Sequence, residues 1–200
     1  MVLFPTLLKI VKSLDYSSIP NDRKEILQVL VDYIQSKDGG KVNLNFVCTH
    51  NSRRSQFSQI WAKTASDYYH VNTNCFSGGV EVTAFNERAV DSIKRFGFNV
   101  ISQGEGNPKY SVHYAEGVSP IVAFSKIVED EMNPSSNFAT IMTCSHADEN
   151  CPFIVGADQR IPIRYTDPKA FDDTEQESEK YDERSLQIAT EMFYVFSKIN

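Results

Sequence analysis

The sequence lacks long hydrophobic runs: none approaches the roughly 18 apolar residues that a membrane-spanning helix needs. Residues 1–14 are partly apolar, but Lys9 and Lys12 interrupt them and no small-residue cleavage site follows, so we expect an amphipathic helix and not a signal peptide. Positive charge is also in short supply, and the net charge of −6 argues against nucleic acid or an anionic membrane as the main partner. These absences predict a cytoplasmic protein.

Cysteine is scarce as well, with four residues at positions 48, 75, 144 and 151 in a chain of 200 residues. A cytosolic chain of this length needs no disulfide bonds for stability, so its thiols are more often catalytic, redox-active or metal-binding. Internal repeats and low-complexity linkers are absent, and the contents of 41% hydrophobic and 23% charged residues are ordinary for a globular protein. The length predicts one domain with an appended segment.

The spacing of apolar residues divides the chain into alternating helices and strands. It predicts helices over residues 6–14, 21–37, 55–70, 83–98 and 172–199. It predicts strands over residues 41–47, 71–79, 137–144 and 157–166, and a hairpin or two short strands over residues 109–115 and 119–125. Strands that alternate with helices imply a parallel sheet covered on both faces. We therefore expect an α/β domain over residues 41–200, preceded by a helical extension over residues 1–40 whose role is open: a lid, a dimer surface or simple packing.

The polar loop CTHNSRRS, residues 48–55, joins a predicted buried strand to a predicted helix. Ligands of α/β sheets bind beyond the carboxyl ends of the strands, where the free N–H groups of the next helix can hold an oxyanion. A cysteine facing those amides is favoured as a thiolate, so Cys48 is the predicted nucleophile. The planar guanidinium of Arg54 can hold two oxygens of a tetrahedral anion. We expect Ser55 to donate a hydrogen bond to the sulfur. We expect Asn51 to hold the loop, because its side chain can bond its own main chain and it tolerates left-handed geometry; the alternative is a structural cysteine beside surface arginines.

Two more cysteines, Cys144 and Cys151, lie in the segment TCSHADENCPF. Cys144 follows another predicted buried strand, so its sulfur could reach the same sheet edge as Cys48. Within one helix the two Cα atoms would lie about 10 Å apart, beyond the roughly 7 Å limit for a disulfide, so a bridge requires the segment to bend, which Pro152 makes plausible. The three thiols can then act in sequence, and an external dithiol such as thioredoxin can reduce the final Cys144–Cys151 bridge.

Other uses of these thiols stay open. Cys144, His146 and Cys151 could bind zinc with a fourth ligand from His50, His70 or His113, although the segment lacks a C-x-x-C spacing. Cys144 and Cys151 could also be unrelated buried thiols. We expect Cys75 to be a core residue of a strand.

A proton donor to the leaving group would assist the attack of the thiolate. Asp167 precedes Pro168, which stiffens the loop and biases Asp167 toward extended geometry. Asp172 and Asp173 are the local alternatives, although they look like carboxylates of the first turn of a helix. Asp167 could also be a simple turn residue.

The loop CTHNSRRS resembles the phosphate-binding loop of the low-molecular-weight protein tyrosine phosphatases, and CSHADENCP resembles the redox segment of the thioredoxin-coupled arsenate reductases that share their fold. The resemblance covers roughly residues 42–199. It implies a three-layer sandwich around a central four-stranded, mostly parallel sheet. It also implies that Asp167 is the general acid, that Cys144 and Cys151 form a redox relay with Cys48, and that no metal or organic cofactor is required. The oxyanion-binding residues that we predict are Thr49, His50, Asn51, Ser52, Arg53, Arg54 and Ser55.

Two residues of the loop depart from the family pattern. His50 stands where glycine is usual, and it could alter the turn or line the mouth of the pocket. Arg53 stands where a second cysteine is frequent, and we expect it to point outward and add positive potential. The resemblance implies an arsenate reductase that takes an oxyanion substrate and thioredoxin or a similar dithiol. The alternatives are a tyrosine phosphatase with the same nucleophile, clamp and acid, and a non-enzymatic redox-sensing or anion-binding module.

Overall fold

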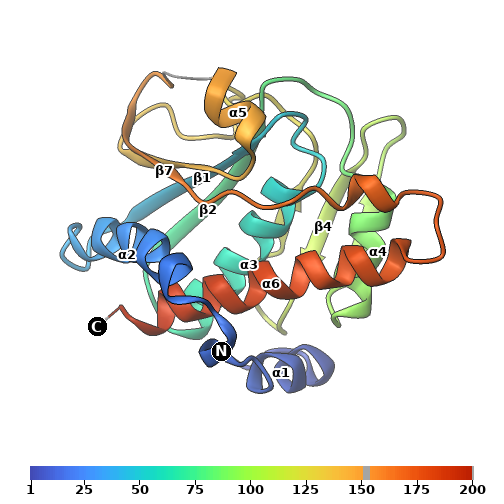
Figure 1. The fold of residues 1–200 in the computed structure, drawn as a ribbon, viewed down its shortest axis with the longest axis horizontal. Coiled ribbons are helices and arrows are strands. Elements are labelled where there is room, and N and C mark those ends of the chain that lie inside the picture. The colour runs from blue at the N-terminus through green and yellow to red at the C-terminus, as the bar shows by residue number, and fades with distance from the viewer. Residues whose placement is uncertain (151–153, 200) are drawn as a thin grey trace.

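The computed structural model describes residues 1–150 and 154–199 (Figure 1). Its elements in chain order are α1 (Pro5–Lys12), the 3-10 helix η1 (Tyr16–Ser18), α2 (Asn21–Gln35), β1 (Val42–Cys48), α3 (Arg54–Tyr68), β2 (Thr73–Gly79), α4 (Glu87–Arg95), β3 (Asn99–Gln103), β4 (Lys109–His113), β5 (Ile121–Ala123), β6 (Phe138–Met142), α5 (Ser145–Asn150), β7 (Ala157–Pro162), the 3-10 helix η2 (Pro168–Phe171) and α6 (Glu177–Ser197).

The central sheet has four strands in the order β2-β1-β6-β7, and every neighbouring pair is parallel. In the register of β1 with β6, Val47 lies opposite Met142. Cys48 ends β1 and Cys144 follows β6 by two residues, so both cysteines lie at the same carboxyl edge of the sheet. This arrangement confirms the predicted four-stranded parallel sheet and places two cysteines of the predicted relay at one edge of it.

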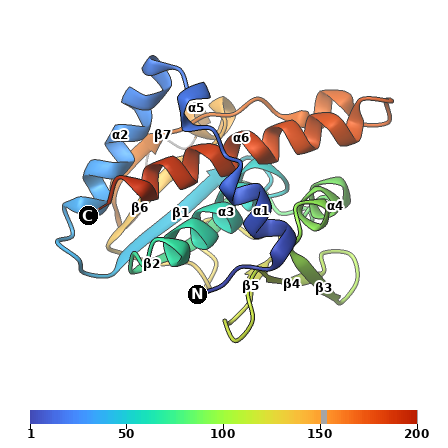
Figure 2. The ribbon, with the colours of Figure 1, turned by 90° about the horizontal axis from the view of Figure 1, so that it is seen from below.

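Both faces of the sheet are covered, as the alternation of β1 side chains requires. Leu44 and Phe46 face the larger core, where α3 packs on the sheet and α6 packs across α3 (Figure 2). Val47 and Met142 face the opposite side and pack against Ala147 of α5 in a smaller cluster. Within the described part of the chain, no helix is both long and apolar enough to cross a membrane.

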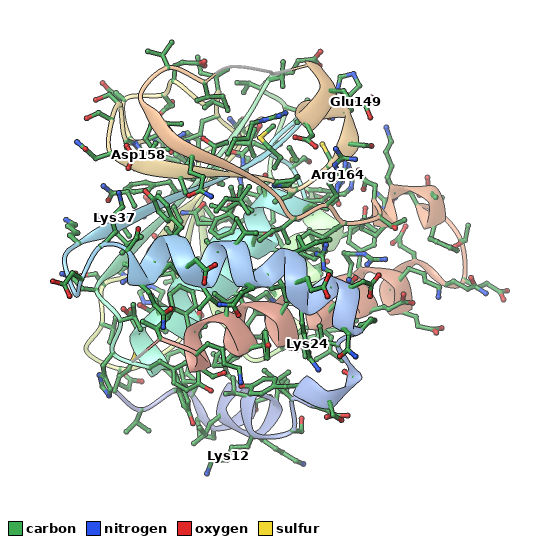
Figure 3. The ribbon with its side chains drawn as sticks, turned by 60° about the vertical axis from the view of Figure 1, so that its left-hand side comes forward. Lys12, Lys24, Lys37, Glu149, Asp158 and Arg164 are labelled. Carbon is green, nitrogen blue, oxygen red and sulfur yellow. The ribbon has the colours of Figure 1, made fainter. Side chains whose placement is uncertain are left out.

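The N-terminal extension packs into the same core as the α/β elements. Leu7 of α1 and Leu27 of α2 are fully buried in the larger cluster. Lys37, after α2, forms an ion pair with Asp158 of β7 at 2.7 Å, and Tyr33 donates a hydrogen bond to the same carboxylate (Figure 3). The extension is therefore fastened to the last strand of the sheet, while its separation as a unit ending at residue 40 stays a prediction.

A second, antiparallel sheet of order β3-β4-β5 extends from the domain. Its strands β4 and β5 pair antiparallel, so of the two alternatives for residues 109–115 and 119–125, a hairpin or two short strands, the structure has the hairpin. The strand β3 was not predicted, because its residues are nearly all exposed and give no apolar alternation.

The helices α4 and α6 begin later than the predicted helices 83–98 and 172–199. The Asn86 side chain caps α4. The backbone N–H of Asn86 donates to the Ser52 carbonyl at 3.0 Å, so the segment before α4 runs along the loop after β1. Asp173, ahead of α6, has a left-handed φ of 62°. Tertiary contacts therefore keep the residues before α4 and α6 out of the helices, and both helices start later than predicted.

Candidate active site

Neighbouring segments of the chain hold the oxyanion loop, residues 48–55, by donating hydrogen bonds to its carbonyl groups. The carbonyls of Thr49, His50 and Ser52 accept hydrogen bonds of 2.7–3.0 Å from neighbouring segments. The backbone N–H groups of residues 49–55, by contrast, find no acceptor in the described part of the chain. Successive unpartnered amides of this kind form a concave site for an anion. The geometry agrees with the predicted oxyanion cradle.

Cys48 lies at the start of this loop, and the residue is 3% exposed. Its Sγ lies 3.0 Å from the Oγ of Ser55. The side-chain Nδ2 of Asn51 donates to the same Oγ at 2.8 Å, which leaves the hydroxyl hydrogen of Ser55 for the sulfur. The predicted contact of Ser55 with the Cys48 sulfur is therefore present.

Asn51 adopts the predicted left-handed backbone, with φ of 47°, and is fully buried. Its side chain does not bond to its own main chain as expected. Its Oδ1 accepts from the Lys126 N–H at 3.0 Å, and its own carbonyl accepts from Gln56 at 2.9 Å. A Cβ on Gly79 would lie 2.7 Å from the Asn51 nitrogen, so only glycine leaves room for this loop backbone. The loop is thus shaped by residues far away in sequence.

Arg54 begins α3 and turns its guanidinium toward the chain after β7. Its Nη1 donates to the Tyr165 carbonyl at 3.1 Å and its Nη2 to the Asp167 carboxylate at 2.6 Å. Its Nε is buried and has no acceptor among the described residues, so an oxyanion oxygen in its reach would satisfy it. Asp167 is extended, as predicted before Pro168, and its other oxygen accepts from the Lys169 N–H at 3.1 Å.

Arg53 does not point outward, contrary to the prediction. Its side chain is only 12% exposed, donates from Nε to the Tyr181 hydroxyl at 2.7 Å and pairs with Asp172 at 3.2 Å. Its charge is therefore largely compensated by a carboxylate. His50 is half-exposed at the mouth of the loop, and its Nε2 lies 3.3 Å from the Glu81 carboxylate.

The alternative acids are engaged elsewhere. Asp172 accepts from the Tyr181 hydroxyl at 2.6 Å in addition to its pair with Arg53, and Asp173 pairs with Arg88 at 2.5 Å. Neither residue lies in the first turn of α6, as their sequence context suggested. Two arginines hold these carboxylates, which leaves Asp167 as the carboxylate on the guanidinium of the candidate anion clamp.

Cys144 lies beside the oxyanion loop and is 1% exposed. Its Sγ lies 3.5 Å from the Thr49 hydroxyl and accepts from the Ala147 N–H at 3.4 Å. Cys144 and Cys48 belong to the same cluster of buried residues. Cys151, the third predicted relay cysteine, lies outside the described residues.

The sequence also offered a zinc site and a position in the core as uses of the cysteines. Over residues 1–150 and 154–199, no group of three His, Cys, Asp or Glu side chains is placed to hold a metal ion. The zinc alternative included Cys151, which is not described. His146 lies with its Nδ1 3.3 Å from the Thr49 hydroxyl. Cys75 is a core residue of β2, as predicted, and its burial raises the pKa of its thiol.

Comparisons with known proteins agree with this geometry. No family model matches the chain. The arsenate reductase of Staphylococcus aureus (strain Newman) is 28% identical over 114 residues, which span 56% of this chain and 67% of that protein. The arsenate reductase of Brevibacillus brevis is 29% identical over 128 residues, which span 64% and 78%. The fold matches that of a low-molecular-weight phosphotyrosine phosphatase from Vibrio cholerae O395, with a TM-score of 0.52 and 15% identity over 78% of this chain and 94% of that one. The chain is thus similar in sequence to arsenate reductases and has the fold of a low-molecular-weight phosphotyrosine phosphatase. These relatives support an enzyme of that kind.

A buried carboxylate holds the helix after Cys144. Asp148 of α5 pairs with Arg160 at 2.5 Å and accepts from the Nε of Arg164 at 2.7 Å. Both arginines come from β7 and the chain just after it. A doubly paired carboxylate fixes α5, and with it the backbone donor of the Cys144 sulfur, against the sheet.

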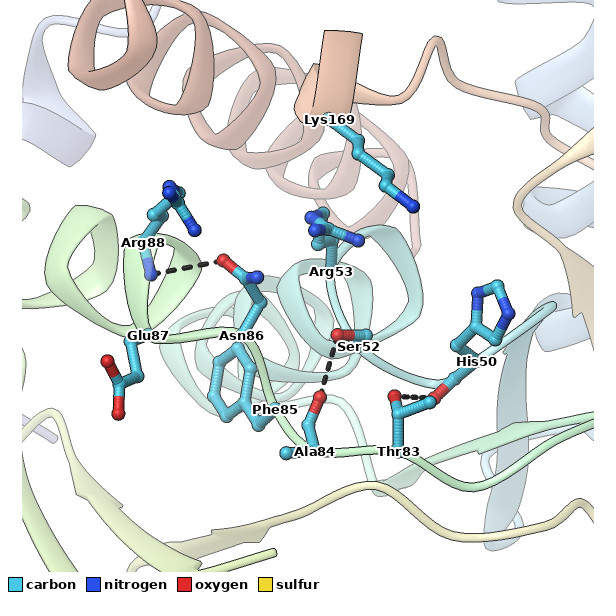
Figure 4. Close-up of a pocket in the computed structure, with 10 residues that line it drawn as sticks. All are labelled: His50, Ser52, Arg53, Thr83, Ala84, Phe85, Asn86, Glu87, Arg88 and Lys169. Carbon is cyan, nitrogen blue, oxygen red and sulfur yellow. Dashed lines mark hydrogen bonds between the residues drawn. The ribbon is translucent and has the colours of Figure 1, made fainter. Parts of the chain in front are cut away.

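A cavity of about 460 Å³ opens beside the oxyanion loop (Figure 4). It is lined by His50, Ser52 and Arg53 of the loop and by Arg88 and Lys169 from other elements. Lys169 extends toward the loop residues and forms no ion pair with any described residue. The candidate site therefore adjoins a pocket whose arginines are paired with carboxylates and whose Lys169 has no ion-pair partner among the described residues.

Three supports of the site were not predicted from the sequence: Gly79, Tyr165 and Asp148. Gly79 ends the strand predicted over residues 71–79, and the close approach of the loop that excludes a side chain there gives no local signal. Tyr165 accepts from Arg54 through its backbone carbonyl. Every residue type has this group, so the sequence gives no sign of the contact. Asp148 gave no signal because its partners are 12 and 16 residues away.

Proposed function

We propose that the protein is an arsenate reductase that works through Cys48, Cys144 and Cys151 and is reduced by thioredoxin or a similar dithiol. The observation that carries this proposal is the thiol of Cys144, buried beside the oxyanion loop at 3.5 Å from Thr49. Hydrolysis of a phosphate ester has no use for a second thiol at that place. The arsenate reductase relatives support the same choice.

In the proposed reaction, the Cys48 thiolate attacks the arsenic of arsenate and forms an S–As bond. The leaving hydroxyl group of the arsenate takes a proton from Asp167 and departs as water. The loop amides and Arg54 compensate the charge of the remaining oxygens. Because Asp167 now pairs with Arg54, arrival of the anion would transfer the guanidinium to the substrate and free the carboxyl group for proton transfer.

The second step moves two electrons. The Cys144 thiolate attacks the Cys48 sulfur, so an S–S bond forms, the S–As bond breaks and its electron pair stays on arsenic, which leaves as arsenite. Cys151 then attacks the Cys144 sulfur and releases the Cys48 thiolate. Thioredoxin reduces the Cys144–Cys151 disulfide, which requires a reducing compartment, so we place the enzyme in the cytoplasm.

The test is arsenate turnover by reduced protein with and without thioredoxin, with the variants Cys151→Ser and Cys75→Ser side by side. We expect Cys151→Ser to abolish thioredoxin-dependent turnover and Cys75→Ser, a core thiol outside the relay, to retain it. Full activity of Cys151→Ser would refute the relay. No arsenate turnover in the unaltered protein would refute the proposed reaction.

A second candidate is hydrolysis of a phosphate monoester, because the cavity beside the oxyanion loop has room for an organic leaving group. Cys48, Arg54 and Asp167 would act as before, and water would resolve the phosphocysteine. The absence of an effect of Cys144→Ser on p-nitrophenyl phosphate hydrolysis, together with no arsenate turnover, would favour this function over the first.

A further inference from the structure

The N-terminal extension carries a buried ion pair with α6. Arg23, in the first turn of α2, donates from Nε and Nη2 to the two carboxylate oxygens of Glu191 at 3.0 and 2.7 Å. The two side chains are 15% and 3% exposed. A bidentate pair at this depth fixes the orientation of both groups, because leaving either charge unpaired is expensive.

Glu191 uses its remaining capacity on two further donors. The Tyr165 hydroxyl donates to it at 2.8 Å and the Gln187 amide at 3.0 Å. The Arg23 guanidinium also lies over the Tyr165 ring, 4.8 Å from its centroid. Tyr165 is therefore held at its hydroxyl by α6 and on its ring face by α2. The pair and its partners form a fully bonded network, which is rigid in a buried setting.

The backbone of Tyr165 connects this network to the active site. Its N–H donates to the Thr143 carbonyl at 3.0 Å, and its carbonyl accepts from the Nη1 of Arg54 at 3.1 Å. The second acceptor of Arg54, the carboxylate of Asp167, is two residues further along the same segment. Both groups that orient the Arg54 guanidinium thus belong to a stretch of chain whose side-chain anchor is Tyr165.

We propose that Arg23 and Glu191 are positioning residues that set the Arg54 guanidinium for oxyanion binding, which gives the N-terminal extension a role in the active site. This inference rests on the role of Arg54 as anion clamp in the proposed function. A planar guanidinium holds an oxyanion only within a narrow range of angles, so a small shift of residues 165–167 weakens binding. Neither residue touches the substrate, and each acts through Tyr165.

The test measures binding of inorganic phosphate to the reduced full-length protein by isothermal titration calorimetry. We expect Arg23→Leu to raise the phosphate dissociation constant about tenfold and Arg23→Lys to raise it less, because a lysine keeps the charge without the fork. Tyr165→Phe keeps the ion pair and the backbone, removes the hydroxyl alone and should raise the constant about threefold. This second variant keeps the proposal testable where Arg23→Leu does not fold.

The control is Asp158→Asn, which breaks a separate tether of the extension, the Lys37 ion pair, and has no link to Tyr165. It should lower the melting temperature and leave phosphate binding unchanged. Equal loss of phosphate binding in Asp158→Asn and Arg23→Leu would show that the extension supports folding in general and would overturn the proposal.

A double-mutant cycle with Arg54→Lys decides whether the effect of Arg23→Leu on phosphate binding depends on the Arg54 guanidinium. In that background, Arg23→Leu should cause no further loss of phosphate affinity, because the guanidinium that it positions is gone. Additive losses would overturn the proposal and leave the proposed function intact. Phosphate binding with the expected coupling but no arsenate turnover would refute the proposed reaction and leave this inference standing. No phosphate binding by the unaltered protein would overturn both.

Discussion

Replacement of Lys126 by methionine should stabilise the protein at neutral pH. Lys126 is 4% exposed, and its N–H holds the Asn51 side chain of the oxyanion loop. Its ammonium group forms no ion pair with a described residue and lies 4.7 Å from the centroid of the Phe124 ring. Burial lowers the pKa of Lys126 from 10.5 to about 8, against a smaller opposing effect of the Asp130 charge. The cation is therefore less stable in the folded protein than in the unfolded chain.

The size of the effect follows from the pKa difference. A fall of the Lys126 pKa from 10.5 to about 8 corresponds to a cost of about 3 kcal/mol to the folded state. Methionine recovers this cost and loses the contact of the cation with the aromatic ring, worth about 1 kcal/mol, so we expect a gain of about 2 kcal/mol at pH 7.

The pH dependence has a definite sign. Between pH 8 and 10.5 the unfolded chain binds a proton at Lys126 that the folded protein does not, so stability rises with pH across this window. Below pH 8 both states are protonated and the whole cost is present. Above pH 10.5 both are neutral and the cost is gone. The advantage of Lys126→Met should therefore be largest at neutral pH and vanish near pH 10.5.

The assay is urea unfolding of the unaltered protein and of Lys126→Met at pH 7 and pH 10, with the difference in unfolding free energy taken at each pH. Lys12→Met, at an exposed position of α1, is the control and should change stability by less than about 0.5 kcal/mol at both pH values. A destabilised Lys126→Met at pH 7, or a difference that is the same at both pH values, would refute the reasoning.

Three further substitutions test the site. Ser55→Ala removes the hydroxyl that contacts the Cys48 sulfur and should lower kcat/KM about tenfold and slow alkylation of that thiol at pH 7, as measured with iodoacetamide. Asp148→Asn removes the charge that binds two arginines and should speed the reaction of Cys144 with a thiol reagent several-fold, because α5 then opens more often; an unchanged rate would contradict the role of the pairs. Gly79→Ala places a Cβ 2.7 Å from a loop nitrogen and should cost about 2–3 kcal/mol in urea unfolding and weaken phosphate binding, and retention of both would show that the loop can shift.

The fold and the centre of the site could be predicted because their signals are local. The buried run before Cys48, the polar loop and the helix start at Arg54 follow one another within a few residues, so spacing alone indicates a strand, an anion-binding turn and a helix. The same holds for Cys144 after β6. Parallel strands then bring both thiols to one edge, which topology rules anticipate.

The orientation of the arginines could not be predicted in this way. Arg53 and Arg54 are adjacent, yet one pairs with Asp172 and Tyr181 and the other with Asp167, all more than 110 residues further along the chain. Which arginine faces the anion depends on which carboxylates the C-terminal segment brings back to the loop. No periodicity in the sequence encodes a choice of that kind.

The sequence by itself determined the α/β class and singled out Cys48, Arg54 and Cys144 as candidate site residues, because each of these signals depends on neighbouring residues. Only the tertiary structure decided that the left-handed turn at Asn51 is held by Lys126, that Gly79 makes room for it, and that Arg23 of the extension reaches Arg54 through Tyr165. The physical reason is that hydrogen bonds and close contacts depend on the distance between groups in space. The separation of two residues along the chain does not determine that distance.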